Sequence, residues 1–244
     1  MITKYRTLAV IAGLFLLGAG SLFAQTPREL RFGTWVSGNL GEGEEQWFSV
    51  RAAGAGFVVV ETEGDLDTIL EAYDASHTLI GANDDGGEDY NARLEIYAEA
   101  GNIYLFKLSC YDDDDDDGES RPYRIRASFD SIPPDAERNT EHTRAVSINL
   151  GEEVPVYLRS PSESRWYYYD ISRAGTLLVV QTRGNMDTLL ALFDDRGNLI
   201  EENDDSGDDA NALISERLGP GTVYIEVKEY GGGMGRCTLH AETR

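Results

Sequence analysis

The fold is decided by residues 64–70, GDLDTIL, which recur 120 residues later as GNMDTLL at residues 184–190. The same offset, with no gap, relates NDD at residues 83–85 to NDD at residues 203–205. Self-similarity at a fixed offset is the mark of a structural unit that is used more than once. The 244 residues are also enough for two domains. The chain is therefore predicted to contain two copies of one domain.

Each copy carries short apolar segments of strand length. Residues 57–60, FVVV, and residues 177–180, LLVV, are apolar runs bounded by glycine. Residues 69–73 and 189–193 are apolar at nearly every position, which suits a strand buried on both faces or a sandwich core strand. Such segments recur at intervals rich in Gly, Asp and Asn, as in sandwiches and jelly rolls. We expect an all-β fold of two tandem, jelly-roll-like β-sandwich domains after a signal peptide.

The limits of the two copies follow from composition. Lys4 and Arg6 precede an apolar stretch that ends near Ala24, which predicts a signal peptide over residues 1–24 and no membrane span after its cleavage. The copies are predicted at residues 28–130 and 142–244. Residues 131–141 contain two prolines and read as a short, semi-stiff linker. We expect a secreted, periplasmic or cell-surface protein.

The chain is strongly acidic, with 21 basic and 44 acidic residues and a formal net charge of −23. Such a surface gains nothing from counterion release on nucleic acid and is repelled by anionic membranes. Hard cations, above all Ca²⁺, are therefore the expected charged ligands. The alternative is that the charge only keeps an exported protein soluble.

Two cysteines fall in different copies, Cys110 in the first and Cys237 in the second. In an oxidising compartment they could form a bridge that staples the domains together. The alternative is two separate buried thiols.

The order of motifs is similar to a known family. An aromatic pair at residues 47–48, a glycine-bounded apolar strand, the Asp-Thr motif, the Asn-Asp-Asp loop and GTVYIEV at residues 221–227 resemble the bacterial pre-peptidase C-terminal domain family. The resemblance covers both copies. It implies a compact β-sandwich that accompanies exported proteins and is not itself catalytic. Some related modules bind calcium, collagen or polysaccharide. The usual peptidase domain is missing here, so no peptidase-linked role is expected.

The acidic loops at residues 83–91 and 203–211 are the main candidate site. Ca²⁺ takes about 6–8 oxygen ligands from carboxylates, amides, backbone carbonyls and water, and a loop of Asp, Asn and Gly can turn these inward. The alternative is that the same side chains form Asx-turns that hold the backbone. The candidate ligands are Asp67, Asp74, Asn83, Asp84, Asp85, Asp89 and Asn91 in the first copy and Asp187, Asp194, Asn203, Asp204, Asp205, Asp209 and Asn211 in the second.

Other features support weaker hypotheses. The six aspartates at residues 112–117 occur in one copy only and are typical of a solvated loop tip, or of a loose cation site. The aromatic residues Trp35, Trp47 and Tyr90, with residues 166–169, could stack on sugar rings, although most are expected to pack in the core or across strands. The Asp-Thr pairs are expected to satisfy backbone donors at a strand entry.

Catalysis has little support in the sequence. His77 aligns with Gly197, so it belongs to no repeated site, and neither a nucleophile elbow nor a His-Glu-x-x-His zinc motif occurs. An acidic pair of the glycosidase kind is possible by residue type, but nothing singles one out. The sequence thus predicts a non-enzymatic binding or accessory protein for a protein or polysaccharide ligand. A carbohydrate-binding protein that uses exposed aromatics, or an exported hydrolase, is the alternative.

Overall fold

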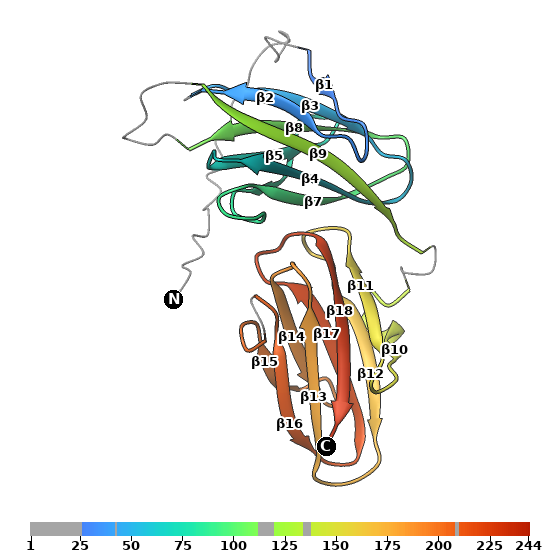
Figure 1. Cartoon of the computed structure of the whole chain (residues 1–244). Helices are drawn as coiled ribbons and strands as arrows, with labels where there is room; N and C mark the ends of the chain where they lie inside the picture. The colour runs from blue at the N-terminus through green and yellow to red at the C-terminus, as the bar shows by residue number, and fades with distance from the viewer. Residues whose placement is uncertain (1–25, 42, 112–119, 134–137, 208–209) are drawn as a thin grey trace.

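The computed structural model describes residues 26–41, 43–111, 120–133, 138–207 and 210–244, and the predicted signal peptide lies outside them. These residues form four sheets in two sandwich domains (Figure 1), which confirms the predicted all-β fold. In the first domain a five-stranded sheet, in the order β1-β3-β8-β5-β6, faces a four-stranded sheet, in the order β2-β9-β4-β7. Its strands are β1 (Arg28–Glu29), β2 (Val36–Leu40), β3 (Gln46–Arg51), β4 (Gly56–Gly64), β5 (Thr68–Tyr73), β6 (Leu79–Asn83), β7 (Arg93–Ala98), β8 (Ile103–Cys110) and β9 (Arg121–Ser131).

The second domain repeats this topology. Its sheets run β10-β12-β17-β14-β15 and β11-β18-β13-β16, so each strand has its counterpart in the first domain. A short 3₁₀ helix, η1 (His142–Arg144), precedes them. The strands are β10 (Val146–Ser147), β11 (Glu153–Leu158), β12 (Arg165–Ile171), β13 (Thr176–Arg183), β14 (Thr188–Phe193), β15 (Leu199–Asn203), β16 (Leu213–Leu218), β17 (Gly221–Glu229) and β18 (Gly235–Thr243).

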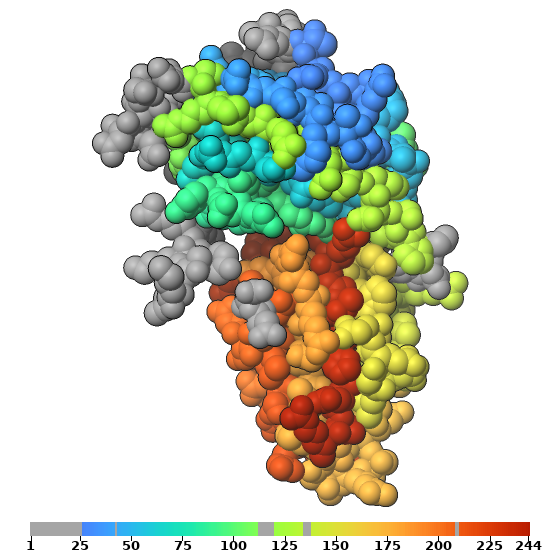
Figure 2. Space-filling model, viewed as in Figure 1, coloured from blue at the N-terminus to red at the C-terminus, as the bar shows by residue number. Residues whose placement is uncertain are grey.

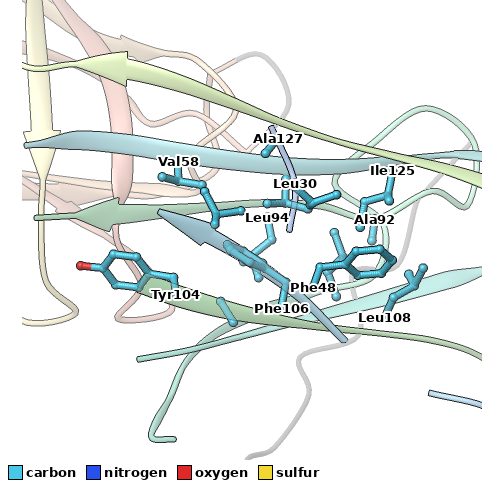
Figure 3. Close-up of a cluster of buried hydrophobic side chains, with 14 of the residues drawn as sticks. Leu30, Phe48, Val58, Ala92, Leu94, Tyr104, Phe106, Leu108, Ile125 and Ala127 are labelled. Carbon is cyan, nitrogen blue, oxygen red and sulfur yellow. The ribbon is translucent and has the colours of Figure 1, made fainter. Parts of the chain in front are cut away.

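Each domain has its own hydrophobic core between its two sheets. In the first domain Phe48, Phe106 and Ile125 are almost completely buried there, and Figure 3 shows them between the sheets with Leu30 and Leu108. Alternate residues of a strand point to opposite faces, so one face of each strand supplies the core. Strand β5 also alternates, which makes it a sandwich core strand rather than one buried on both faces.

The Asp-Thr motif places a threonine inside each core. The hydroxyl oxygens of Thr62 and Thr68 lie 2.6 Å apart, and the backbone N–H of Ala92 donates to them at 3.0 Å and 2.9 Å. Thr182, Thr188 and the N–H of Ala212 repeat this arrangement. Buried polar groups must find partners, and these threonines satisfy one another and a backbone donor. The prediction that the Asp-Thr pairs serve backbone donors is confirmed for the threonines, whereas Oδ1 of Asp187 accepts no hydrogen bond.

The second domain packs end-on against the outer face of the first domain's four-stranded sheet (Figures 1 and 2). On that face the side chain of Phe57 is fully buried although it lies outside the first domain's core. Its ring stacks on Tyr157 of β11, with 6.2 Å between centroids. The guanidinium of Arg159 lies over the ring of Tyr97 at 5.8 Å. The backbone N–H of Tyr97 also meets the sulfur of Met234 at 3.0 Å.

Two further sequence predictions concern the cysteines and the linker. Cys110 and Cys237 form no disulfide, so the alternative of separate thiols holds. Asn139, within the predicted linker, is buried against the second domain, where its carbonyl accepts the N–H of Trp166 at 2.8 Å.

Across the described part of the chain, no helix has the length and apolar character needed to span a membrane.

Candidate functional site

The two domains share a geometry that brings acidic side chains together at one end of each sandwich. In the first domain the β6–β7 loop lies there beside the residue that precedes β5. In the second domain the β15–β16 loop lies beside the residue that precedes β14. We call this end the acidic pole. It comprises Asp67, Asp84, Asp85 and Asn91 in the first domain and Asp187, Asp204, Asp205 and Asn211 in the second.

The pole of the first domain is organised around Tyr111, which directly follows β8. Its backbone N–H donates to the carbonyl of Asp67 at 3.0 Å, and its hydroxyl donates to Oδ2 of Asp84 at 2.8 Å. The hydrogen bond to Asp84, partial burial, and the charges of Asp84, Asp67 and Asp85 raise the pKa of Tyr111 to about 12. Three carboxylates are therefore close enough to act on one hydroxyl.

Asn91 closes the loop of this pole from inside. It is 5% exposed, and its Nδ2 donates to the carbonyls of Gly64 at 3.1 Å and Glu88 at 3.0 Å. Its Oδ1 is buried and accepts no hydrogen bond. A Cβ on Gly87 would lie 2.5 Å from the carbonyl oxygen of Asn91, so the loop needs glycine there. The loop thus holds an amide oxygen whose hydrogen-bonding capacity is unused.

The pole of the second domain carries one more carboxylate. Oδ1 of Asp187 is buried without a hydrogen bond, and burial, followed by the charges of Glu229, Asp205 and Asp204, raises the pKa of Asp187 to about 6. Burial also raises the pKa of Glu229, although the N–H groups of residues 231–233 partly oppose that rise. The equivalent position in the first domain, opposite Thr68, is Cys110.

Several predicted ligands hold the backbone instead. Oδ1 of Asn83 accepts the N–H groups of Gly86 at 2.7 Å and Arg93 at 3.2 Å, and Oδ1 of Asn203 accepts those of Ser206 and Leu213. These are the Asx-type turns that the alternative interpretation expects. The carbonyl lone pairs of both residues are already engaged.

Asp74 and Asp194 lie away from the poles. Oδ1 of Asp74 accepts the N–H groups of Ser76 and Thr78, both at 2.8 Å, in the β5–β6 turn. Asp194 does the same in the β14–β15 turn. Strand β5 separates Asp67 from Asp74, and its six residues span about 20 Å at ~3.3 Å per residue. The structure therefore does not bring Asp74 or Asp194 together with the other predicted ligands.

The remaining predicted residues give a partial picture. Asp89 is exposed and adopts a left-handed backbone with φ of 55°. Asp209 and the aspartates at 112–117 lie outside the described residues. Within the described part of the chain, no three His, Cys, Asp or Glu side chains already converge as ligands of one metal ion. A cation at a pole would have to draw on amide, backbone and water oxygens as well as carboxylates.

The aromatic side chains mostly pack on the sheets. Trp166 lies 5.3 Å from the ring of Phe193, and Trp47 lies 5.3 Å from that of Tyr73. Trp35 is covered by the guanidinium of Arg126 at 4.5 Å. Tyr90 is 67% exposed, beside the first pole.

The three histidines occupy unrelated places. His77 forms part of the β5–β6 turn, His142 packs on Tyr224 with 4.0 Å between ring centroids, and His240 lies near Glu153 at 3.8 Å. None of these three contacts joins a histidine to an acidic pole.

Sequence reasoning missed Tyr111 and Glu229. Tyr111 directly follows β8 and Glu229 ends β17, the strands that pair with β5 and β14. Tyr111 corresponds to Tyr230, and Cys110 to Glu229, at an offset one residue shorter than that of the loops. Allowing for that shift would have shown that Tyr111 and Tyr230 are equivalent, and that Glu229 replaces Cys110.

Comparison with known proteins gives likenesses of fold. No family model and no curated protein matches the chain. The pre-peptidase C-terminal domain of a collagenase from Bacillus anthracis is similar over 43% of this chain and 98% of that domain, with 12% identity and a TM-score of 0.36. A periplasmic inhibitor of g-type lysozyme from Aeromonas hydrophila, PliG, is similar over 43% of this chain and 96% of its own, with 15% identity and a TM-score of 0.35.

A larger protein shows similarity over both domains. Tripeptidyl peptidase 2 matches 89% of this chain with 24% of its own length, at 10% identity and a TM-score of 0.30. At these identities the likenesses concern the β fold alone. Two tandem copies of the pre-peptidase C-terminal family therefore stay a prediction from the sequence motifs.

Proposed function

We propose that this chain is an exported, non-catalytic binding protein whose two β-sandwiches present a ligand surface for a protein or polysaccharide, and whose first acidic pole binds Ca²⁺. Export is supported by the basic and apolar pattern of residues 1–24. The likeness to PliG, a periplasmic inhibitor, and to a collagenase's accessory domain agrees with a binding role.

The observation that carries the calcium proposal is the buried Oδ1 of Asn91, which accepts no hydrogen bond. An orphaned buried acceptor costs about 1–3 kcal/mol, and a cation ligated by it would remove that cost. Asp67, Asp84 and Asp85 supply negative charge at the same pole. Carboxylate and amide oxygens are the ligands that Ca²⁺ prefers.

The residues that would hold the ion are Asp67, Asp84, Asp85 and Asn91, with backbone and water oxygens completing the shell. Bound there, Ca²⁺ would neutralise the carboxylates and fix the β6–β7 loop against the end of β8. Its role would be to stiffen a loop of a binding surface. The corresponding residues of the second domain stay predicted ligands, and one of them, Asp187, lines a cleft against the first domain.

Differential scanning calorimetry of the mature chain tests the proposal. Ca²⁺ at 100 times its dissociation constant should stabilise the fold by about 2.7 kcal/mol relative to EDTA. Asp84→Asn should remove most of this stabilisation. The matched control is Asp74→Asn, which makes the same chemical change at the far end of β5 and should keep it.

The result also separates calcium binding from the wider function. Equal melting temperatures in Ca²⁺ and EDTA would end the calcium claim and leave the binding role to be tested by ligand screening. Loss of the calcium effect in Asp74→Asn but not in Asp84→Asn would place the ion elsewhere.

A further inference from the structure

A cleft of about 380 Å³ lies where the second acidic pole meets the first domain. Strands β6 and β7 of the first domain line one side, and the β17–β18 loop and the residues before β14 of the second domain line the other. Asp187 and Glu229 line it from the second domain, and Arg93 and Glu95 line it from the first. The cleft exists only because the two domains are docked.

The charges in this cleft do not balance. Glu95 meets both basic side chains, with Arg93 at 3.4 Å and Arg236 at 3.3 Å. Arg236 also reaches Asp130 at 2.6 Å. The two guanidiniums are thus neutralised by Glu95 and Asp130. Among the described residues, no basic side chain forms an ion pair with Asp187 or Glu229. Glu229 accepts the backbone N–H of Gly233, but both carboxylates lack a cationic partner there.

Part of the cleft next to these carboxylates is apolar, although most of its lining is polar. Met186 and Leu94 are buried side chains of the cleft, and Met234 and Ile80 pack on the first domain's core. On the side of the second domain, the lining includes Gly231, Gly233 and Gly235, which have no side chains to fill the cleft. A mixed lining, with carboxylates beside methionine and leucine side chains, suits a long alkyl stem with a cationic head, which is the structure of lysine and arginine side chains.

We propose that this cleft between the domains binds one arginine or lysine side chain of a basic partner protein, with the cationic group at Asp187 and Glu229. The alkyl stem would lie along Met186 and Met234. The whole chain's net charge of −23 would steer such a partner toward it. The inference goes beyond the calcium proposal, which concerns the other pole.

A divalent metal ion fits this cleft less well. Arg93 and Arg236 place two guanidiniums on its lining, and these repel a doubly charged ion more strongly than a single positive charge. The side chains of Met186, Met234 and Leu94 offer no oxygen to a hard cation. A guanidinium, by contrast, can take both carboxylates through its several donors while its stem uses the apolar walls.

The two acidic poles also differ in one carboxylate, and this difference favours the second pole as the site of the cationic side chain. The first domain has Cys110 in place of Glu229, and its thiol contacts the carbonyl of Gly41 at 3.7 Å. The first pole therefore lacks the second carboxylate of the pair. Asp67, Asp84 and Asp85 of the first pole do not line the cleft, so this pole serves as the comparison site.

The experiment is a two-dimensional amide NMR titration of the mature chain with the peptide acetyl-Gly-Gly-Arg-Gly-Gly-amide. The control peptide carries citrulline, which has the same shape without the charge. We expect the arginine peptide to shift the amides of Gly231, Gly233 and Met234, with a dissociation constant of about 1 mM for one side chain. Asp187→Asn and Glu229→Gln should each weaken binding about tenfold, or ~1.4 kcal/mol.

The two proposals fail separately. Asp84→Asn should abolish the calcium effect and leave peptide binding unchanged, whereas Asp187→Asn should weaken peptide binding about tenfold and leave the calcium effect unchanged. Circular dichroism melting of each variant shows that it is folded. Equal binding of the citrulline peptide, peptide binding that survives in both cleft variants, or no spectral change at about 10 mM arginine peptide would overturn the inference.

Discussion

Removing the charge of Asp187 should stabilise the protein at neutral pH in the absence of any bound cation. Burial and the neighbouring carboxylates raise the pKa of Asp187 from 3.8 to about 6, so its ionised form is disfavoured in the folded state. In full, that rise corresponds to about 3 kcal/mol. Solvent screening of this partly exposed carboxyl lowers the expected gain for Asp187→Asn to about 1 kcal/mol, or ~4 °C in melting temperature.

The pH dependence fixes the sign of this effect. A raised pKa means that the folded state binds the proton more tightly, so its contribution is complete below about pH 4 and is lost as pH rises through about 6. The advantage of Asp187→Asn, measured by calorimetry in EDTA, should therefore be largest near pH 7.5, shrink as pH falls through about 6, and vanish below about pH 4.

Asp194→Asn is the control of opposite sign for this test. Hydrogen bonds from Asn198 and Arg196 lower the pKa of Asp194, so loss of its charge should not stabilise. An Asp187→Asn variant that melts below wild type at about pH 7.5, or whose advantage grows on acidification, would refute the reasoning.

Three further predictions concern the fold. His77→Gly should stabilise by about 1 kcal/mol in chemical denaturation, because His77 has φ of 60° where the second domain has Gly197, and the reverse Gly197→His should destabilise by a similar amount. Thr188→Val should cost about 2 kcal/mol, measured by urea unfolding, because its hydroxyl is buried among hydrogen-bond partners; no loss would show that the network is dispensable. Phe57→Ala should cost about 3 kcal/mol and loosen the contact with Tyr157, seen as an expanded radius in small-angle X-ray scattering; an unchanged radius would contradict the docked arrangement.

Much of the fold could be predicted because the sequence repeats. The match of residues 64–70 to residues 184–190 placed the same strand entry in both domains, and the structure gives β5 and β14 at these positions. Alternation within β5 could not be predicted, since its outward residues Ile69 and Tyr73 are apolar as well. They are half-buried on the sheet's outer side, where Tyr73 packs on Trp47.

The candidate site could be predicted only in part. The sequence predicted Asp84 and Asn91 as ligands from one loop, with Asp67 added from outside it, and the structure brings them to one pole. The sequence could not distinguish a metal ligand from a residue that stabilises a turn. Asp74 carries the same carboxylate as Asp84, but its Oδ1 accepts the N–H groups of its own turn. The cleft lay beyond sequence reasoning, since it depends on how the second domain docks on Phe57 and Tyr97.

The central claim is that the acidic pole of the first domain binds a cation. Isothermal titration calorimetry of Ca²⁺ into the EDTA-stripped mature chain tests it most directly. We predict saturable binding of one ion per chain, lost in Asp84→Asn and retained in Asp187→Asn. Heat that is absent in wild type, or that disappears with Asp187→Asn while Asp84→Asn titrates normally, would contradict it.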